Sequence, residues 1–240
     1  MPKILLHVCC GPCSLMPVVH LREEGWDVSA FFFNPNIHPE EEWTRRCDAM
    51  AEAAHHLHIP LMVEGEGVDP VKWVSELYGT TAYGTRCRFC YRPRMERTAE
   101  LAREKNFDAF TSSLLYSRYQ QHDAIREEAE RAFAIYGTPF LYRDFRQWWW
   151  EGIAMAKDIG LYRQKWCGCV LSMKEAQIQQ KKALEEKAAQ RAERAERLAK
   201  EEEERLRRKE AIAARPNKRA RKAMAKAAAE KESFLAKEKP

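Results

Sequence analysis

The sequence predicts an α/β fold, a mostly parallel sheet flanked by helices, because short apolar segments alternate with longer amphipathic ones. Five apolar runs bounded by polar or turn residues are expected to form buried strands: 4–8, 28–33, 59–63, 109–111 and 140–142. Four stretches with apolar residues three and four positions apart are expected to form helices: 14–24, 39–57, 92–105 and 121–135. Consecutive parallel strands would be joined by right-handed crossovers.

Local signals place the first strand and the first helix. Ser14 is the expected N-cap of that helix and Gly25 its expected C-terminal stop. In sheets of this kind, ligands bind beyond the carboxyl ends of the strands. Cys9 and Cys10 directly follow the first strand, so we expect their thiols to open onto that edge of the sheet.

The chain divides into two parts of different composition. Residues 1–173 hold nearly all the Gly, Trp, Tyr and Phe, as expected of one catalytic α/β domain. Residues 174–240 carry 21 Lys and Arg against 13 Asp and Glu, about +8, whereas the preceding part is near −3. No apolar run approaches the roughly 18 residues of a membrane span.

The tail, residues 174–240, is expected to be an exposed, partly frayed helix. Its large apolar residues are too sparse for a coiled-coil seam, and many Glu residues stand four positions from Lys or Arg. Pro216 and Asn217 interrupt the pattern, and a basic cluster follows at 218–222. The tail is either a solvated solubility extension or a contact to nucleic-acid phosphates.

The cysteines carry the strongest chemical signal. Seven of the eight lie in three tight groups: Cys9-Cys10-x-x-Cys13, Cys87-x-x-Cys90 and Cys167-Gly168-Cys169. The start of the chain shows no secretory leader, so we expect a cytoplasmic protein, in which clustered thiols indicate metal binding or redox catalysis. The eighth, Cys47, lies inside a predicted helix and is expected to serve packing.

Two of these groups suit a shared iron–sulfur centre. Cys87 and Cys90 come just before a predicted helix, whose dipole would stabilise their thiolates. Cys9 and Cys10 supply two further ligands if the backbone bends at Gly11-Pro12. A [4Fe–4S] cluster takes four such thiolates. Zinc, bound tetrahedrally by the same thiols, is the alternative.

The remaining grouped cysteines differ in kind. One Gly between Cys167 and Cys169 allows a small, strained disulfide that is easily reduced, so we expect a redox-active pair. The alternative is that both ligate a second metal. Cys13 either ligates a second metal beside the cluster or caps the first helix together with Ser14.

Several separated motifs occur along residues 1–173 in a specific order. They are HVCCGPCS at 7–14, FNPNIHP at 33–39, RCRFCY at 86–91, TSSLLYS at 111–117, YQ at 119–120, His122, DFR at 144–146 and CGC at 167–169. Together they resemble the cobalamin-independent, QueH type of the epoxyqueuosine reductase family. The resemblance stops before the charged tail.

The resemblance implies reduction of epoxyqueuosine, a hypermodified base in a tRNA anticodon loop, to queuosine, in a three-layer fold like those of nucleotide hydrolases and PP-loop proteins. It implies a [4Fe–4S] cluster on four thiols: Cys9, Cys10, Cys87 and Cys90. Cys167 and Cys169 match a redox-active pair, and an additional iron beside the cluster would suit Cys13. The implied partners are tRNA and an electron donor.

Epoxide reduction needs two electrons and two protons, whereas one [4Fe–4S] cluster usually passes one electron at a time. A dithiol or a neighbouring iron meets that need, and iron with an open position acts as a Lewis acid. His122, Asp144 and His38 are candidate proton donors, with a surface histidine and an ordinary ion pair as the alternatives for the first two. Tyr119 and Gln120, and also His38, are candidate contacts to a flipped-out base.

Two other function classes explain parts of the sequence. The loop Gly11-Pro12-Cys13-Ser14 stands between a strand and a helix, as in ATP-dependent tRNA-modifying enzymes, but it lacks the Gly-x-x-x-x-Gly-Lys pattern. A zinc-stabilised tRNA-binding module explains the cysteine groups and the basic tail. It leaves the Cys-Gly-Cys pair without a role.

Overall fold

The computed structural model describes residues 1–67, 70–77, 79, 81–214 and 217–237. The chain forms two units, Met1–Ile178 and Gln179–Pro240. The division therefore falls between Ile178 and Gln179, whereas the composition of the sequence changes at Lys174.

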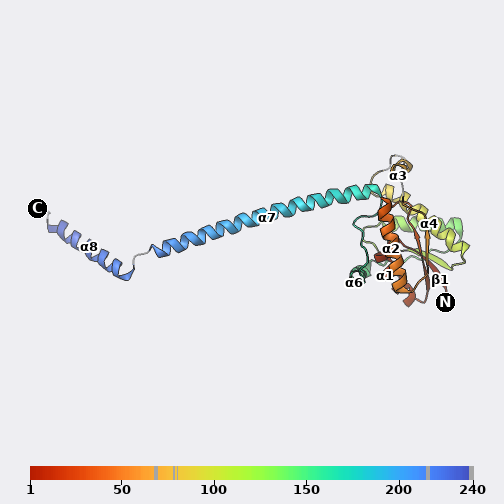
Figure 1. Ribbon diagram of the computed structural model, residues 1–240, viewed down its shortest axis with the longest axis horizontal. Helices are drawn as coiled ribbons and strands as arrows, with labels where there is room; N and C mark the ends of the chain where they lie inside the picture. The colour runs from red at the N-terminus through yellow and green to blue at the C-terminus, as the bar shows by residue number, and fades with distance from the viewer. Residues whose placement is uncertain (68–69, 78, 80, 215–216, 238–240) are drawn as a thin grey trace. The chain divides into compact units, whose positions relative to one another are not determined.

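The first unit is built on a parallel sheet of four strands in the order β3-β2-β1-β4 (Figure 1). The strands are β1 (Lys3–His7), β2 (Asp27–Phe33), β3 (Leu61–Glu64) and β4 (Ala109–Ser112). Ile4 of β1 pairs with Val28 on one side and with Ala109 on the other, so β1 is central. A strand buried on both faces is uniformly apolar, as Ile4, Leu5 and Leu6 are. The predicted α/β class is confirmed.

The fifth predicted strand, 140–142, is wrong. Within the described residues it forms a single parallel bridge between Phe140 and Phe110. The Leu141 N–H donates to the Phe110 carbonyl at 2.8 Å, and the Phe110 N–H donates to the Pro139 carbonyl at 2.9 Å. Pro139 has no N–H of its own to extend the ladder, so the pairing ends after one bridge.

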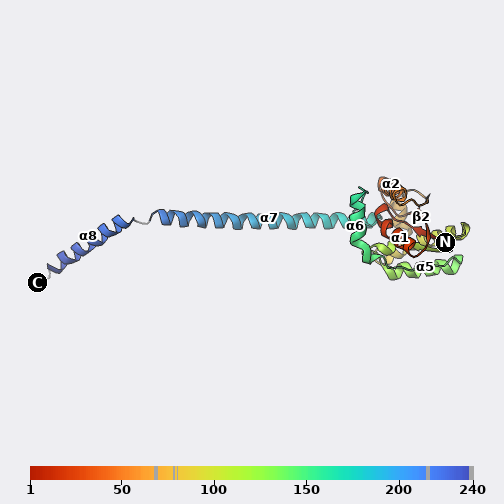
Figure 2. The same cartoon turned by 90° about the horizontal axis from the view of Figure 1, so that it is seen from below.

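Helices cover both faces of the sheet. The helices are α1 (Gly11–Glu23), α2 (Glu40–Leu57), α4 (Thr85–Glu104) and α5 (His122–Tyr136). Helix α1 packs against α2, and α4 packs against α5. Because crossovers between parallel strands are right-handed, the first pair covers one face and the second pair covers the other (Figure 2). Two helices that periodicity did not predict are α3 (Pro70–Glu76) and α6 (Trp149–Asp158), and α6 packs beside α1.

Two helices begin earlier than predicted. Helix α1 starts at Gly11, with Pro12 in its first turn, where a missing N–H costs nothing. Ser14 is therefore not the N-cap; its buried hydroxyl donates to the Gly11 carbonyl at 2.7 Å. Gly25, at φ +88°, follows the helix as the predicted stop. Helix α4 starts at Thr85 and contains the Cys87-x-x-Cys90 motif instead of following it.

The charged tail is helical, as predicted. Helix α7 (Val170–Ala213) begins in the first unit and continues into the second, which also contains α8 (Lys218–Lys237). Ion pairs four residues apart run along α7, including Lys200 with Glu196 at 2.6 Å. The predicted interruption at Pro216 lies outside the described residues. Among the helices described, none has both the length and the apolar character needed to cross a membrane.

Candidate thiol-rich metal site

A buried histidine ties together the carboxyl ends of three strands. His7 Nδ1 lies 2.9 Å from Ser112 Oγ, and its Nε2 lies 3.1 Å from the Phe33 carbonyl. Because a carbonyl only accepts, Nε2 carries the proton and the Ser112 hydroxyl donates to Nδ1. Burial, aided by the charge of Arg94, lowers the pKa of His7 to about 3, so the ring is neutral at pH 7. The neutral His7 side chain therefore joins the carboxyl ends of β1, β2 and β4 beside Cys9.

The leading thiol trio consists of Cys9, Cys10 and Cys13. Their Sγ atoms all lie within 4.8 Å of one another and all three residues are buried. Cys9 and Cys10 occupy the turn between β1 and α1, and Cys13 lies in the first turn of α1, where the helix dipole favours negative charge. Hydrogen bonds from the Cys10 and Cys13 thiols hold the pKa of Cys9 well below its usual range.

The position of Cys13 excludes one of its two predicted roles. Since α1 begins at Gly11, Cys13 is inside the helix and the capping role is wrong. Its thiol instead meets those of Cys9 and Cys10, which supports the role of metal ligand. Its Sγ also accepts a hydrogen bond from Gln164 Nε2 at 3.6 Å.

The turn that carries the trio is held tightly. A Cβ at Gly11 would stand 2.2 Å from the Ala49 carbonyl oxygen of α2, so only glycine fits there. The Cys9 N–H donates to Ser113 Oγ at 3.2 Å, and Asn34 Nδ2 donates to the Val8 carbonyl at 2.9 Å. Backbone and side chain therefore both fix the direction of these sulfurs.

The second thiol group lies on α4. Cys87 is in its first turn and is partly buried, whereas Cys90 is one turn further on and is buried. Burial raises the pKa of Cys90. Cys90 packs with Cys169, Trp73 and other apolar side chains in a small cluster of its own. In the part of the chain that is described, neither α4 thiol joins the leading thiol trio within 4.8 Å.

The segment Cys167-Gly168-Cys169, called here the CGC turn, is anchored through its backbone. Arg46 donates to the carbonyls of Cys167 and Trp166, both at 2.9 Å, and the His38 N–H donates to the Gly168 carbonyl at 2.9 Å. Gly168 has φ +142°, a conformation that a residue with a Cβ rarely adopts. Its α-carbon also faces Ile37, which a Cβ would approach to 3.2 Å.

The two sulfurs of the CGC turn have different surroundings. Cys169 is buried, and its Sγ accepts a hydrogen bond from the Ser172 N–H at 3.4 Å, at the start of α7. Cys167 is exposed, and its Sγ accepts a hydrogen bond from Gln120 Nε2 at 3.1 Å. Both thiols are free. Cys167 is therefore the more exposed residue of the pair, although burial raises the pKa of its thiol.

The predicted substrate-binding residues gather near this turn. Gln120 joins Cys167 to Tyr91, whose hydroxyl donates to Gln120 Oε1 at 2.7 Å. Tyr119, next to Gln120, is 75% exposed, and its ring meets Trp149 edge-on at 5.8 Å. His38 reaches the same turn through its backbone N–H. The structure thus brings Gln120 and His38 to the CGC turn, with Tyr119 next to Gln120 in the chain.

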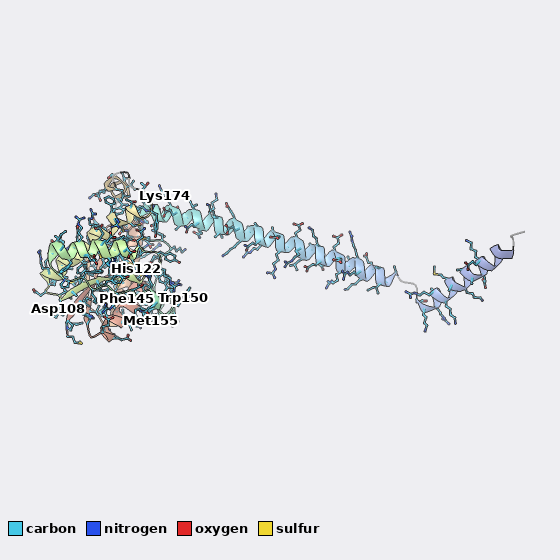
Figure 3. The ribbon with its side chains drawn as sticks, turned by 180° about the vertical axis from the view of Figure 1, so that it is seen from behind. Asp108, His122, Phe145, Trp150, Met155 and Lys174 are labelled. Atoms are coloured by element: carbon cyan, nitrogen blue, oxygen red, sulfur yellow. The ribbon has the colours of Figure 1, made fainter. Side chains whose placement is uncertain are left out.

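His122 and Asp144 are near each other, and among the described residues neither makes a hydrogen bond to a thiol. His122 lies at the start of α5 (Figure 3), with Nδ1 4.0 Å from Asp144 Oδ1. Arg146 donates through Nη2 and Nε to the two oxygens of the Asp144 carboxylate, at 2.6 and 2.8 Å. These hydrogen bonds hold the pKa of Asp144 below its usual range. Burial lowers the pKa of His122. The ion-pair alternative for Asp144 is thus present, and the catalytic role of both residues stays a prediction.

Sequence reasoning missed two buried arginines, Arg46 and Arg94, each 1% exposed. Arg46 donates through Nε to Glu42 Oε1 at 2.7 Å, and Tyr162 donates to the other oxygen of Glu42 at 2.6 Å. Arginines in a charged helical segment are typical of solvated faces, so periodicity gave no signal. His7 was also missed, although a lone histidine in an apolar strand is a signal that the sequence does contain.

The donor set fits a thiophilic metal. Thiolates select zinc, Cu(I) or iron–sulfur clusters, and the leading thiol trio presents three sulfurs in one buried place at a helix N-terminus. Cys87 lies in the first turn of a second helix, where the dipole again favours a thiolate. The fold and the site together define an α/β protein with a metal-competent thiol centre at the carboxyl edge of its sheet.

Comparison with known proteins identifies the family. The model of the family described as epoxyqueuosine reductase QueH matches residues 4–175. The chain belongs to this family and is an oxidoreductase. The match includes all three cysteine groups and ends at the start of the charged tail.

Individual relatives support the assignment of the chain to this family. The epoxyqueuosine reductase QueH of Thermotoga maritima is 33% identical over 181 residues, which is 73% of this chain and 92% of that protein. The protein of the same name from Dehalococcoides mccartyi is 34% identical over 173 residues, 71% of this chain and 92% of that protein. Among solved structures, the U34-tRNA thiolase NcsA from Methanococcus maripaludis with its [4Fe-4S] cluster matches at TM-score 0.41 and 15% identity, covering 74% of this chain and 65% of that one. A TM-score this low adds nothing to the argument.

Proposed function

We propose that the chain reduces the epoxide of epoxyqueuosine in a tRNA anticodon loop, giving queuosine, the last step of queuosine biosynthesis, and that it acts in the cytoplasm. One observation carries the proposal. The family match over residues 4–175 coincides with a buried trio of thiols at the edge of the sheet where α/β proteins bind ligands.

The proposed cofactor is a [4Fe–4S] cluster on four thiols: Cys9, Cys10, Cys87 and Cys90. When bound, it would supply electrons one at a time. Cys13 is the proposed ligand of an additional iron, because its sulfur lies within 4.8 Å of both Cys9 and Cys10. The chain supports negative charge at these sulfurs through the N-terminal ends of α1 and α4.

Cys167 and Cys169 are proposed as a two-electron store. Oxidation of their two thiols to one disulfide releases two electrons and two protons, the number needed to convert an epoxide into an alkene and water. Cys167, the more exposed residue of the pair, is the one that an electron donor or the substrate would meet first. An external donor must then reduce the disulfide once per turnover, by two electrons.

Tyr119, Gln120 and His38 are proposed to bind the base beside this pair. The exposed Tyr119 ring offers a face on which an unstacked base can lie. The Gln120 amide is held by Tyr91 and contacts Cys167, so a base bonded to it would lie close to the thiol. His122 is the proposed proton donor, with the Asp144 carboxylate 4.0 Å from its Nδ1.

The basic cluster at the start of α8 is proposed to contact tRNA phosphates. Asn217 caps this helix, its Oδ1 accepting from the Ala220 N–H at 2.8 Å. A chain truncated after Ile178 should bind tRNA more weakly and with a smaller salt dependence, while it still reduces a short anticodon stem-loop. Filter binding across a salt series measures this; an unchanged affinity and slope would make the tail a solubility extension.

One experiment tests reaction and cofactor together. The protein is reconstituted anaerobically with iron and sulfide and incubated with epoxyqueuosine-containing tRNA and a chemical reductant, and the nucleosides are analysed by mass spectrometry. We expect brown protein containing iron and acid-labile sulfide, and conversion to queuosine. Colourless protein that holds only zinc and leaves the nucleoside unchanged would instead support a zinc-stabilised tRNA-binding module.

A further inference from the structure

Three arginines are buried among the described residues: Arg86, 5% exposed, pairs with Glu175 at 2.6 Å, and the charges of the other two are compensated in different ways. Arg46 and Arg94 are each 1% exposed and are among the largest fully buried side chains. Arg46 is neutralised within the fold: Glu42, itself 2% exposed, lies 2.7 Å from its Nε. Its two remaining nitrogens donate to backbone carbonyls. The charge and the donors of Arg46 are therefore fully satisfied.

Arg94 has no such partner. It lies on α4, one turn after Cys90, and its guanidinium donates to the side-chain oxygen of Asn36, which is 1% exposed. Within the described part of the chain, no carboxylate lies at ion-pair distance from Arg94, and its Nε has no hydrogen-bond partner. Burial of an unpaired charge is strongly unfavourable. A compensating anion is therefore expected close to this guanidinium.

Thiols lie close to Arg94 in the fold. Arg94 follows Cys90 by one turn of α4, and both residues are buried. Its hydrogen-bond partner Asn36 faces the CGC turn, because a Cβ at Gly168 would stand 3.4 Å from Asn36 Nδ2. In their ionised form, Cys90, Cys167 and Cys9 are among the groups that raise the pKa of Arg94 against the effect of burial.

We propose that Arg94 is the built-in counter-ion of the metal–thiolate centre, and that its buried guanidinium makes the bound iron–sulfur cluster easier to reduce. The inference rests on the proposed function, since it requires an anionic cluster on these thiols. Each electron that enters such a cluster adds one negative charge. A fixed positive charge in a low-dielectric interior stabilises the reduced form more than the oxidised form.

The first test is a redox titration of the reconstituted cluster in three variants, followed by its absorbance. R94Q should make reduction at least tenfold less favourable, which is about 59 mV more negative for one electron. R94K keeps the charge and should stay near the wild-type potential. R103Q removes an exposed arginine of the same helix and should change nothing. An R94Q potential equal to wild type, or an R94K potential as low as that of R94Q, would overturn the proposal.

The second test measures thermal unfolding and does not require the redox potential of the cluster. In the metal-free protein Arg94 is buried and, among the described residues, has no carboxylate partner, so R94M should be at least as resistant to thermal unfolding as wild type. Metal loading should then raise the melting temperature of wild type more than that of R94M. If neither R94M nor R94Q folds without metal, Arg94 is a structural residue and the proposal is wrong.

The two tests separate this inference from the proposed function. If wild type takes up only zinc, the iron–sulfur reductase function fails, and the counter-ion role in cluster reduction fails with it. If wild type binds the cluster and reduces epoxyqueuosine but R94Q has an unaltered potential, the proposed function stands and only the role of Arg94 is lost.

Discussion

The leading thiol trio and the CGC turn present sulfur in opposite ways. The trio is buried, and its turn is fixed by Gly11 against α2 and by hydrogen bonds to Ser113. The CGC turn is held mainly through backbone carbonyls, and Cys167 is an exposed residue whose sulfur contacts Gln120. Sulfurs that are enclosed and aimed at one another suit a resident metal. An exposed cysteine is suited to reacting with other molecules at each turnover.

The largest expected effect comes from a substitution in the leading thiol trio. Cys10→Ala removes one of three sulfurs that lie within 4.8 Å and should abolish stable iron uptake and all activity, because thiolate ligands cannot be replaced by a methyl group. Iron and sulfide analysis after reconstitution measures this. Cys47→Ala, a cysteine outside every group, is the matched control and should retain full iron content. Equal iron content in the two variants would remove Cys10 from the ligand set.

The next effect separates the exposed thiol from the metal site. Cys167→Ser should leave iron content unchanged and reduce multiple-turnover activity to the background rate, because one thiol cannot form the disulfide that releases two electrons. Iron analysis and nucleoside mass analysis on the same preparation check both points. Sustained turnover in Cys167→Ser and in Cys169→Ser would show that the CGC turn is structural.

A third change loosens the CGC turn without touching a sulfur. Arg46→Met deletes both hydrogen bonds to the Trp166 and Cys167 carbonyls and leaves Glu42 buried without its cation. Loss of one partner of a buried pair costs about 3–5 kcal/mol of the free energy of unfolding. Urea unfolding measures this, and Arg103→Met, at an exposed site on α4, should change stability by less than about 0.5 kcal/mol. A cost for Arg46→Met as small as that of the control would show that the turn does not depend on this arginine.

The smallest effect tests the backbone of the CGC turn. Gly168→Ala should cost about 1–3 kcal/mol, since its φ of +142° is strained for alanine and the new methyl group would lie 3.2 Å from Ile37. Gly137→Ala is the comparison, because Gly137 also has positive φ but nothing lies within 4 Å of the added atom. Thermal unfolding of both variants measures the difference. Gly168→Ala should be the less stable of the two; the reverse order would mean that contact with Ile37 is unimportant.

The sequence predicted the architecture better than the boundaries of its elements. Alternation of apolar runs located all four strands, because buried parallel strands leave a clear apolar signal. The start of α1 was placed three residues late, because Ser14 is a common capping residue and the contact between Gly11 and Ala49 involves residues 38 positions apart. The helix predicted over 92–105 begins at Thr85, so Pro93 lies inside α4.

The candidate site was only partly predictable for the same reason. Clustered cysteines are visible in any sequence, so Cys9, Cys10 and Cys13 were found. The arginines are not visible in this way, because Arg46 and Arg94 look like the other charged residues of amphipathic helices. Their burial follows from how α2 and α4 pack against the sheet and the CGC turn, and no local pattern encodes that packing.

The close approach of Gly11 to the backbone of α2 bears on how the proposed metal would be inserted. Because there is no room for even one extra carbon at Gly11, the turn that carries the leading thiol trio has little freedom to rearrange once the chain has folded. The apoprotein should therefore meet incoming iron with its sulfurs already in place. Cofactor insertion would then be governed by the delivery of iron and sulfide and by thiol deprotonation, with little change of backbone shape on loading.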